Sequence, residues 1–251
     1  MNESRTHKSS IAQESLTKTS HRFTVAGGTV KDAQYMTMDS QLIETARERA
    51  RAFFVNARGS HGWDHVERVV NLCRVLGPRE GCDMGILLAA AYLHDIGREE
   101  CDRENGARCH AEVGAAMARR ILEELGAPEA FIHAVQTAVA AHRYRGGPEP
   151  STPEAKVLFD ADKLDGIGAV GIGRAFQFAG EIGARLHDPH VDVDATSAYG
   201  ADDTAYREYL VKLRHVRERM LTASGREMAG ERSLFMEKFF RRLNAEAEGI
   251  L

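Results

Sequence analysis

The sequence is poor in cysteine, has no long apolar run and carries no excess of basic residues, and each shortage excludes a class of protein. Its four cysteines show no CxxC spacing, and we expect reduced thiols. The longest apolar stretch is far shorter than the roughly 20 residues of a membrane span. A formal net charge of −4 gives no electrostatic basis for binding duplex nucleic acid or an anionic membrane. The N-terminal residues lack an apolar export segment, so the predicted location is cytoplasmic.

The composition indicates a globular protein with one unstructured end. Hydrophobic residues make up 43% and charged residues 28% of the 251 residues, which is enough for one large domain. Residues 1–37 are rich in Ser, Thr, Lys and His and have few large apolar side chains, so we expect a disordered tail. We assign 38–187 to the domain core and 188–251 to a C-terminal loop and helical extension of the same domain.

The pattern of apolar residues beyond the tail is helical almost throughout. No window alternates between apolar and polar residues as a strand would. The third predicted helix contains the apolar run 86–93 and the doublet that follows it, and stops at Gly97. The fold class is therefore all-α, with helices expected near 39–56, 64–76, 86–97, 108–125, 128–144, 153–164, 203–222 and 225–247.

A His-Asp doublet, His94 and Asp95, ends the apolar run 86–93. Two adjacent side chains of this kind in so apolar a setting need a compensating partner, and a divalent cation satisfies an imidazole and a carboxylate together. The alternative is a set of buried polar groups that only bind one another. Further His and Asp residues complete the order H…HD…H…H…D, which favours a metal-dependent hydrolase: His65, His110, His142 and Asp162.

Three segments carry a family resemblance: 60–69 (SHGWDHVERV), 93–97 (LHDIG) and 160–165 (DADKLD). Together they resemble the HD-domain metal-dependent phosphohydrolase superfamily. Residues 160–174 and 220–231 are similar to standalone bacterial HD proteins that include nucleotide pyrophosphohydrolases. The resemblance extends over about residues 40–248 and implies a helical HD-domain bundle with a C-terminal helical extension.

The resemblance implies a metal site of two imidazoles and two carboxylates: His65, His94, Asp95 and Asp162. Such a ligand set suits Mn²⁺, the ion we expect, or Mg²⁺, Fe²⁺ or Ni²⁺, and suits Zn²⁺ less well. A bound ion of this kind lowers the pKa of its water and neutralises a phosphoryl oxygen.

Further positions match residues that lie near the substrate in this family. His110 and His142 match two histidines that bind a second metal in some members and lie near the substrate phosphates in others. Asp165 is predicted to orient a ligand or the attacking water. The basic side chains predicted to contact phosphate are Lys163, Arg68 and Arg143.

The expected activity is hydrolysis of a phosphorylated small molecule. The expected substrate is a nucleoside triphosphate, which would be cleaved to a monophosphate and pyrophosphate. Residues 96–100 (IGREE) lack the Glu-Asp pair of the alarmone-hydrolase branch, which argues against guanosine tetraphosphate. Two alternatives remain: an HD-type di-iron oxygenase, which the order of six ligands also resembles, and a non-catalytic nucleotide sensor. A homodimer is left open.

Overall fold

The computed structural model describes residues 38–55, 59, 62–103, 109–143 and 147–251. The predicted disordered tail, 1–37, lies outside the described residues. The described part contains helices joined by turns and irregular segments, with no strand, as the predicted all-α class requires. Its elements in chain order are α1 (Met38–Arg51), η1 (Ala52–Phe54), α2 (Trp63–Leu76), η3 (Gly77–Arg79), α3 (Met84–Leu93), α4 (Arg98–Arg103), α5 (His110–Glu124), α6 (Glu129–Ala141), α7 (Pro153–Asp165), α8 (Gly168–Glu181), α9 (Ala205–Val211), η4 (Leu213–Arg219) and α10 (Ala223–Ala247).

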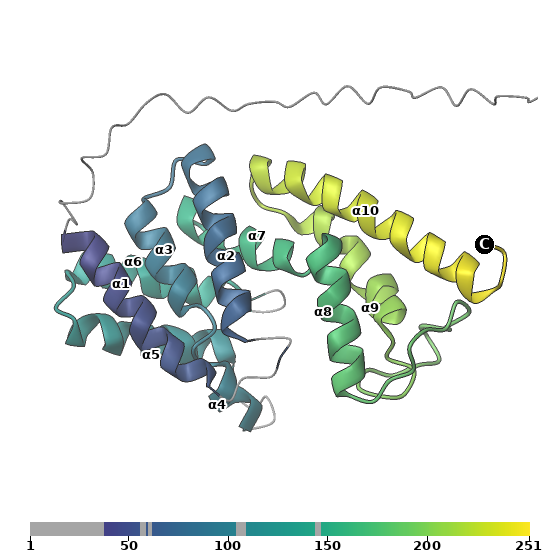
Figure 1. The fold of residues 1–251 in the computed structure, drawn as a ribbon. Helices are drawn as coiled ribbons and strands as arrows, with labels where there is room; N and C mark the ends of the chain where they lie inside the picture. Colours follow the sequence, from purple (N-terminus) through teal and green to yellow (C-terminus); the bar gives the residue numbers. More distant parts are fainter. Residues whose placement is uncertain (1–37, 56–58, 60–61, 104–108, 144–146) are drawn as a thin grey trace, which may run out of the picture. The chain divides into compact units, whose positions relative to one another are not determined.

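Helix α3 lies at the centre of the first seven helices (Figure 1). Its N-terminus is capped by Asp83, whose carboxylate accepts from the backbone amides of Gly85 and Ile86 at 2.8 and 3.2 Å. The helix is apolar on every side, as expected of a helix that is buried all round. It contacts α1, α2, α5, α6 and α7, so the residues that follow its C-terminus emerge inside the bundle.

The doublet lies in a turn and not in a helix, which corrects the predicted boundary at Gly97. Helix α3 ends at Leu93, and a second short helix, α4, begins at Arg98. The turn packs closely on α5, since a Cβ at Gly97 would lie 2.5 Å from the backbone nitrogen of Gly114 and 2.6 Å from the carbonyl oxygen of His110. This close approach brings the start of α5 beside the doublet.

The C-terminal helices are anchored to α7 and η3. Asp160 of α7 accepts hydrogen bonds from the amides of Leu221 and Thr222, both at 2.8 Å, and from the Thr222 hydroxyl at 2.6 Å. Glu80 accepts from the amide and hydroxyl of Ser224 at 2.8 and 2.6 Å. Helix α10 therefore begins against the same helix that carries the predicted metal ligand Asp162.

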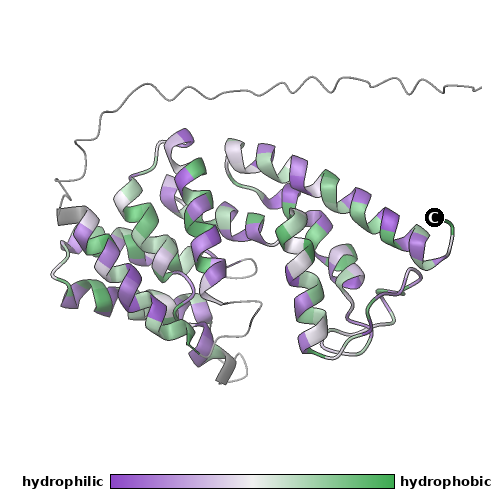
Figure 2. Cartoon of the chain, viewed as in Figure 1, coloured by the Kyte–Doolittle hydropathy of each residue, from purple (hydrophilic) through white to green (hydrophobic). Residues whose placement is uncertain are grey.

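The remainder of α10 packs on α8 and η4, and hydrophilic and hydrophobic residues alternate along it in Figure 2. The single helix predicted near 203–222 is interrupted at Lys212, whose φ of −139° and ψ of −56° separate α9 from η4. All described residues belong to one compact unit, while the division at residue 187 stays a prediction. Within them, no helix has both the length and the apolar character needed to span a membrane.

Candidate metal centre

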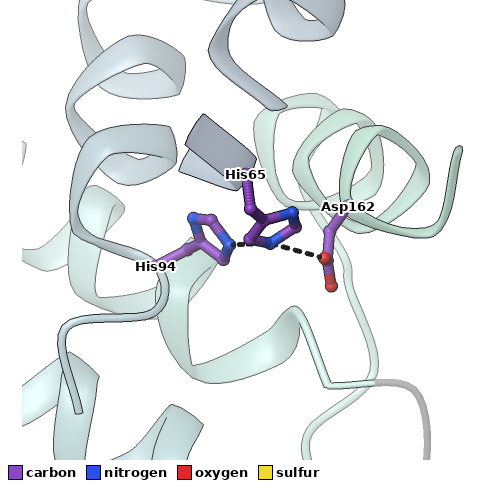
Figure 3. A group of neighbouring side chains, drawn as sticks. All are labelled: His65, His94 and Asp162. Carbon is purple, nitrogen blue, oxygen red and sulfur yellow. Dashed lines mark hydrogen bonds and ion pairs between the residues drawn. The ribbon is translucent and has the colours of Figure 1, made fainter. Parts of the chain in front are cut away.

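His65 and His94 face each other through their Nε2 atoms (Figure 3). His65, in the first turn of α2, donates from Nδ1 to the Asp165 carboxylate at 2.7 Å. His94 donates from Nδ1 to the carbonyl oxygen of Ala91 at 2.8 Å. Since a carboxylate and a carbonyl only accept hydrogen bonds, both Nδ1 atoms carry a proton. In the neutral imidazoles, two Nε2 lone pairs then lie 3.2 Å apart, an arrangement that a cation between them stabilises.

Two carboxylates complete this group. The Oδ1 atom of Asp162 on α7 lies 3.4 Å from His65 Nε2. The Oδ2 atom of Asp95 lies 3.8 Å from His65 Nε2 and 3.9 Å from His94 Nε2. Ligand atoms about 2.1 Å from one ion are separated from each other by about 3.0 to 4.2 Å. The ligand atoms of His65, His94 and Asp162 all lie within 4.8 Å of one another, and Asp95 reaches both histidines at spacings that suit the same ion.

Burial and charge set the protonation of these side chains. Burial lowers the pKa of His94 to about 4. Burial alone would raise the pKa of Asp162, but the neighbouring Lys163 ammonium and the hydrogen bond from His65 hold it well below its usual value. The pKa of His65 is raised, because hydrogen bonds to Asp162 and Asp165 outweigh its burial.

A second cluster of ligand atoms forms around the other oxygen of Asp95. Its Oδ1 atom lies 3.6 Å from His142 Nε2 and 3.8 Å from His110 Nε2. His142 donates from Nδ1 to the Val139 carbonyl at 2.6 Å, while its buried Nε2 has no hydrogen-bond partner among the described residues. Burial, followed by the charge of Arg98, lowers the pKa of His110 to about 3. Asp95, His110 and His142 therefore form a second candidate cation site.

Asp165, which is predicted to orient a ligand or the attacking water, binds the Nδ1 side of the His65 ring. Its buried carboxylate accepts from His65 Nδ1, from Arg68 Nε at 2.6 Å and from Arg174 Nη1 at 2.8 Å. A carboxylate bound to the far nitrogen of a metal-ligating histidine fixes the orientation of the ring. Arg68 also donates to the exposed Asp64 at 2.6 Å, so its guanidinium lies between two carboxylates.

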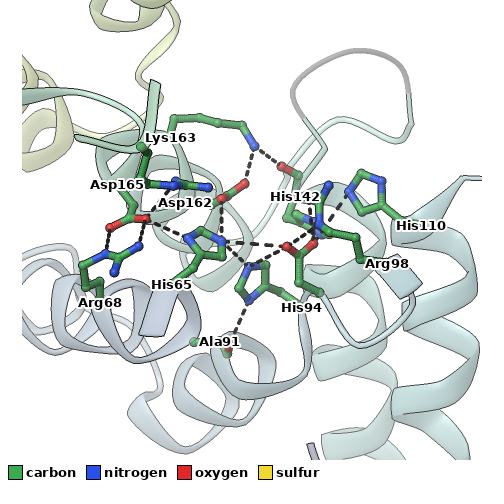
Figure 4. A network of polar contacts seen from close by, with 12 residues as sticks. His65, Arg68, Ala91, His94, Arg98, His110, His142, Asp162, Lys163 and Asp165 are labelled. Atoms are coloured by element: carbon green, nitrogen blue, oxygen red, sulfur yellow. Dashed lines mark hydrogen bonds and ion pairs between the residues drawn. The ribbon is translucent and has the colours of Figure 1, made fainter. Parts of the chain in front are cut away.

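The two remaining predicted site residues, Lys163 and Arg143, differ in their contacts and exposure. Lys163 contacts the Asp162 carboxylate and donates to the carbonyl oxygen of His142 at 2.8 Å. Its ammonium therefore lies between the two candidate cation sites (Figure 4). Arg143 directly follows His142 and is exposed.

Two arginines at the centre were missed by the sequence analysis. Arg98 donates from Nε to Asp95 Oδ2 at 2.7 Å and from Nη2 to Oδ1 at 3.0 Å, and Arg174 binds Asp165. The spacing of three residues between Asp95 and Arg98 is a local signal that indicates this contact. Arg174 lies in the segment that carries the family resemblance, but nothing in the sequence indicates its partner.

Comparisons with known proteins find relatives that share the fold of this chain. Residues 62–167, which contain all four predicted ligands, match the HD domain family. The uncharacterized Bacillus subtilis protein YpgQ is 32% identical over 209 residues, 82% of this chain and 94% of YpgQ. The crystal structure of YpgQ in complex with ADP matches with a TM-score of 0.64 and 29% identity, over 83% of this chain and 100% of that one. An HD-superfamily hydrolase from Bacillus thuringiensis matches with a TM-score of 0.66 and 25% identity, over 84% and 98% of the two chains.

Proposed function

Because this chain belongs to the HD-domain family, we propose that it is a divalent-metal-dependent phosphohydrolase acting on nucleotides. The proposed reaction converts a nucleoside triphosphate to a monophosphate and pyrophosphate, with Mn²⁺ as the ion. The proposed ligands are His65, His94, Asp95 and Asp162. A homodimer and a cytoplasmic location remain predictions from the sequence.

One observation carries the metal dependence: the facing Nε2 atoms of His65 and His94. Each ring is held by an acceptor at Nδ1, Asp165 for one and the Ala91 carbonyl for the other. Hydrogen bonds that fix the tautomer in this way are the usual support of metal-ligating histidines. A group of buried polar residues that only bind one another would pair a donor with an acceptor, whereas here the neutral rings present two acceptors to each other at 3.2 Å.

A divalent ion at this place would supply Lewis-acid stabilisation of a phosphoryl oxygen and a more acidic water. The chain's own residues supply positioning and charge. Asp165 holds the His65 ring, and Arg68 and Arg174 hold Asp165. The Lys163 ammonium is next to Asp162, where it would offset the negative charge that develops on a phosphate in the transition state.

The proposal of a nucleotide substrate is supported by one relative. YpgQ was crystallised with ADP, and 94% of its length aligns with this chain. The three cationic side chains predicted to contact phosphate differ in their suitability here. Lys163 contacts Asp162 and the His142 carbonyl, Arg143 is exposed directly after His142 in the chain, and Arg68 is bound to Asp165 and Asp64. We therefore propose Lys163 and Arg143 as phosphate contacts and Arg68 as a positioning residue.

The di-iron oxygenase alternative has one observation in its favour, the second cluster of Asp95, His110 and His142. This alternative requires two ions that share the Asp95 carboxylate. Both oxygens of that carboxylate already accept hydrogen bonds from Arg98, which argues against it. The sensor alternative predicts nucleotide binding without turnover.

A comparison of metal-loaded and chelated protein tests the proposed function. Nucleoside triphosphates are incubated with Mn²⁺-loaded protein, with chelated protein and with an Asp95→Asn variant, and the released pyrophosphate and orthophosphate are measured. We expect pyrophosphate from the loaded wild-type protein alone. Equal, negligible turnover in all three samples, with nucleotide bound, would support the sensor instead. Oxygen uptake by iron-loaded protein would support the oxygenase.

A further inference from the structure

Arg98 binds both oxygens of the one carboxylate shared by the two candidate cation sites. Its Nε lies 2.7 Å from Asp95 Oδ2 and its Nη2 lies 3.0 Å from Oδ1. The Asp95 side chain is fully buried, whereas that of Arg98 is 26% exposed. A planar guanidinium bound in this two-point manner lies along the edge of the carboxylate between its two oxygens.

A carboxylate that bridges two metal ions uses the same edge, with one oxygen toward each ion. The first oxygen, Oδ2, faces His65 and His94, and the second, Oδ1, faces His110 and His142. The guanidinium contacts both oxygens, slightly closer to Oδ2. The first cluster keeps Asp162 as a second carboxylate, so the competition affects the second cluster more. There the guanidinium already provides the positive charge that Oδ1 needs, and two imidazoles are the only other ligands that this cluster offers among the described residues.

The charge around the centre also disfavours a second ion. Four cationic side chains contact its three carboxylates through described contacts, in the pairs Arg98–Asp95, Lys163–Asp162, Arg68–Asp165 and Arg174–Asp165. Each of these carboxylates therefore already has a cationic partner before any metal binds. One divalent ion adds positive charge to this group, and a second would be placed beside Arg98 in surroundings that screen charge poorly.

We propose that the Arg98 guanidinium takes the place of a second cation at the Asp95–His110–His142 cluster and so limits the centre to one divalent ion. This inference rests on the proposed function, because it assumes a first ion at His65, His94, Asp95 and Asp162. Arg98 is a positioning residue in this view. It leaves the lone pair of His142 available to a substrate or its water while excluding a metal.

Metal stoichiometry tests the proposal directly. The full chain is freed of metal, equilibrated with Mn²⁺, and its manganese content is measured by mass spectrometry, with electron paramagnetic resonance to distinguish isolated from coupled Mn²⁺. We expect one isolated Mn²⁺ in the wild-type protein and two coupled ions in Arg98→Met, with second-ion affinity at least about tenfold higher than in the wild type. Arg98→Met combined with His110→Ala should return to one ion. Arg119→Met, which removes an arginine paired with Glu129 at 2.8 Å on the surface, is the matched control and should bind one.

Each other result has a distinct meaning. Two ions in the wild-type protein, or one ion in a folded Arg98→Met variant, would overturn the role of Arg98 and leave the proposed function standing. No bound ion in the wild-type protein would overturn the proposed function itself. Should Arg98→Met fail to fold, His110→Ala in the wild-type background still decides. Its manganese content and affinity should equal those of the wild type, and a lower content would show that His110 holds an ion when Arg98 is present.

Discussion

Replacing Asp165 with asparagine removes a negative charge from a buried contact while keeping the size of the side chain. In the wild-type protein this carboxylate accepts from His65 at 2.7 Å, from Arg68 at 2.6 Å and from Arg174 at 2.8 Å. Asparagine keeps one oxygen as a weaker, neutral acceptor and places an amide NH2, which only donates, where the other oxygen had accepted. We expect both the stability of the metal-free protein and its affinity for metal to fall.

The pKa of Asp165 sets the size of the stability effect. Burial alone would raise this pKa, but the hydrogen bonds from His65 and Arg68 outweigh it and lower the pKa from 3.8 to about 2. That difference corresponds to about 2 kcal/mol of folding free energy near neutral pH. Because the folded-state pKa is depressed, the contribution is fully present above about pH 5 and is lost as the pH falls toward about 2.

Denaturant unfolding of metal-free wild-type and Asp165→Asn protein at pH 7, 5 and 3 measures this effect. The variant should be about 2 kcal/mol less stable at pH 7 and 5, with the gap reduced to about half at pH 3. Asp64→Asn is the matched control, since Asp64 also binds Arg68 but is exposed, and it should cost less than about 1 kcal/mol. A gap that is absent at pH 7, or the same at all three pH values, would refute the reasoning.

The same variant separates a positioning role from a ligand role. Loss of a partner that orients a metal ligand lowers metal affinity or activity about 10- to 100-fold. At saturating Mn²⁺ the variant should therefore retain its ion and lose turnover. Loss of the ion under those conditions, as complete as in a ligand variant, would contradict the role given to Asp165.

Three further predictions concern the ion, the phosphate contact and the C-terminal anchor. Mn²⁺ at 100 times its dissociation constant should stabilise wild-type protein by about 2.7 kcal/mol and leave His94→Ala unchanged in thermal unfolding; stabilisation of the variant would remove His94 from the ligand set. Lys163→Met should keep its manganese content but lose about 100-fold in turnover, and a variant that instead loses metal would place Lys163 in metal retention. Glu80→Gln should cost about 1 kcal/mol at pH 7. Hydrogen bonds from Ser224 lower the pKa of Glu80, so the cost should shrink as the pH falls below about 4, and a cost independent of pH would exclude this cause.

The helical class and the grouping of the candidate ligands could be predicted because both depend on local patterns. Apolar periodicity indicates helices, and the four predicted ligands stand in short motifs at the start of α2, after α3 and near the end of α7. The exact end of α3 could not be predicted in this way. It depends on the contact of Gly97 with the backbone of α5 around Gly114, and a contact between distant helices leaves no local pattern.

The partners of charged residues were the hardest to predict. Asp165 was predicted to orient a ligand or the attacking water, and its carboxylate accepts from His65 and from Arg68, which is 97 positions away in the sequence. The sequence shows that both residues are charged, but only the packing of α2 against α7 brings them together. Asp160 illustrates the same limit. Its carboxylate accepts hydrogen bonds from the amides of Leu221 and Thr222, which lie 61 and 62 positions further along the chain, just before α10.

The most direct test of the proposed function is phosphorus NMR of Mn²⁺-loaded protein with ribo- and deoxyribonucleoside triphosphates in ¹⁸O-labelled water. The account predicts monophosphate and unlabelled pyrophosphate, with ¹⁸O incorporated into the monophosphate, because water attacks the α-phosphorus. Orthophosphate as the first product would contradict the proposed bond cleavage. No turnover by protein that demonstrably holds its ion at His65, His94, Asp95 and Asp162 would contradict the assignment of this centre to nucleotide hydrolysis.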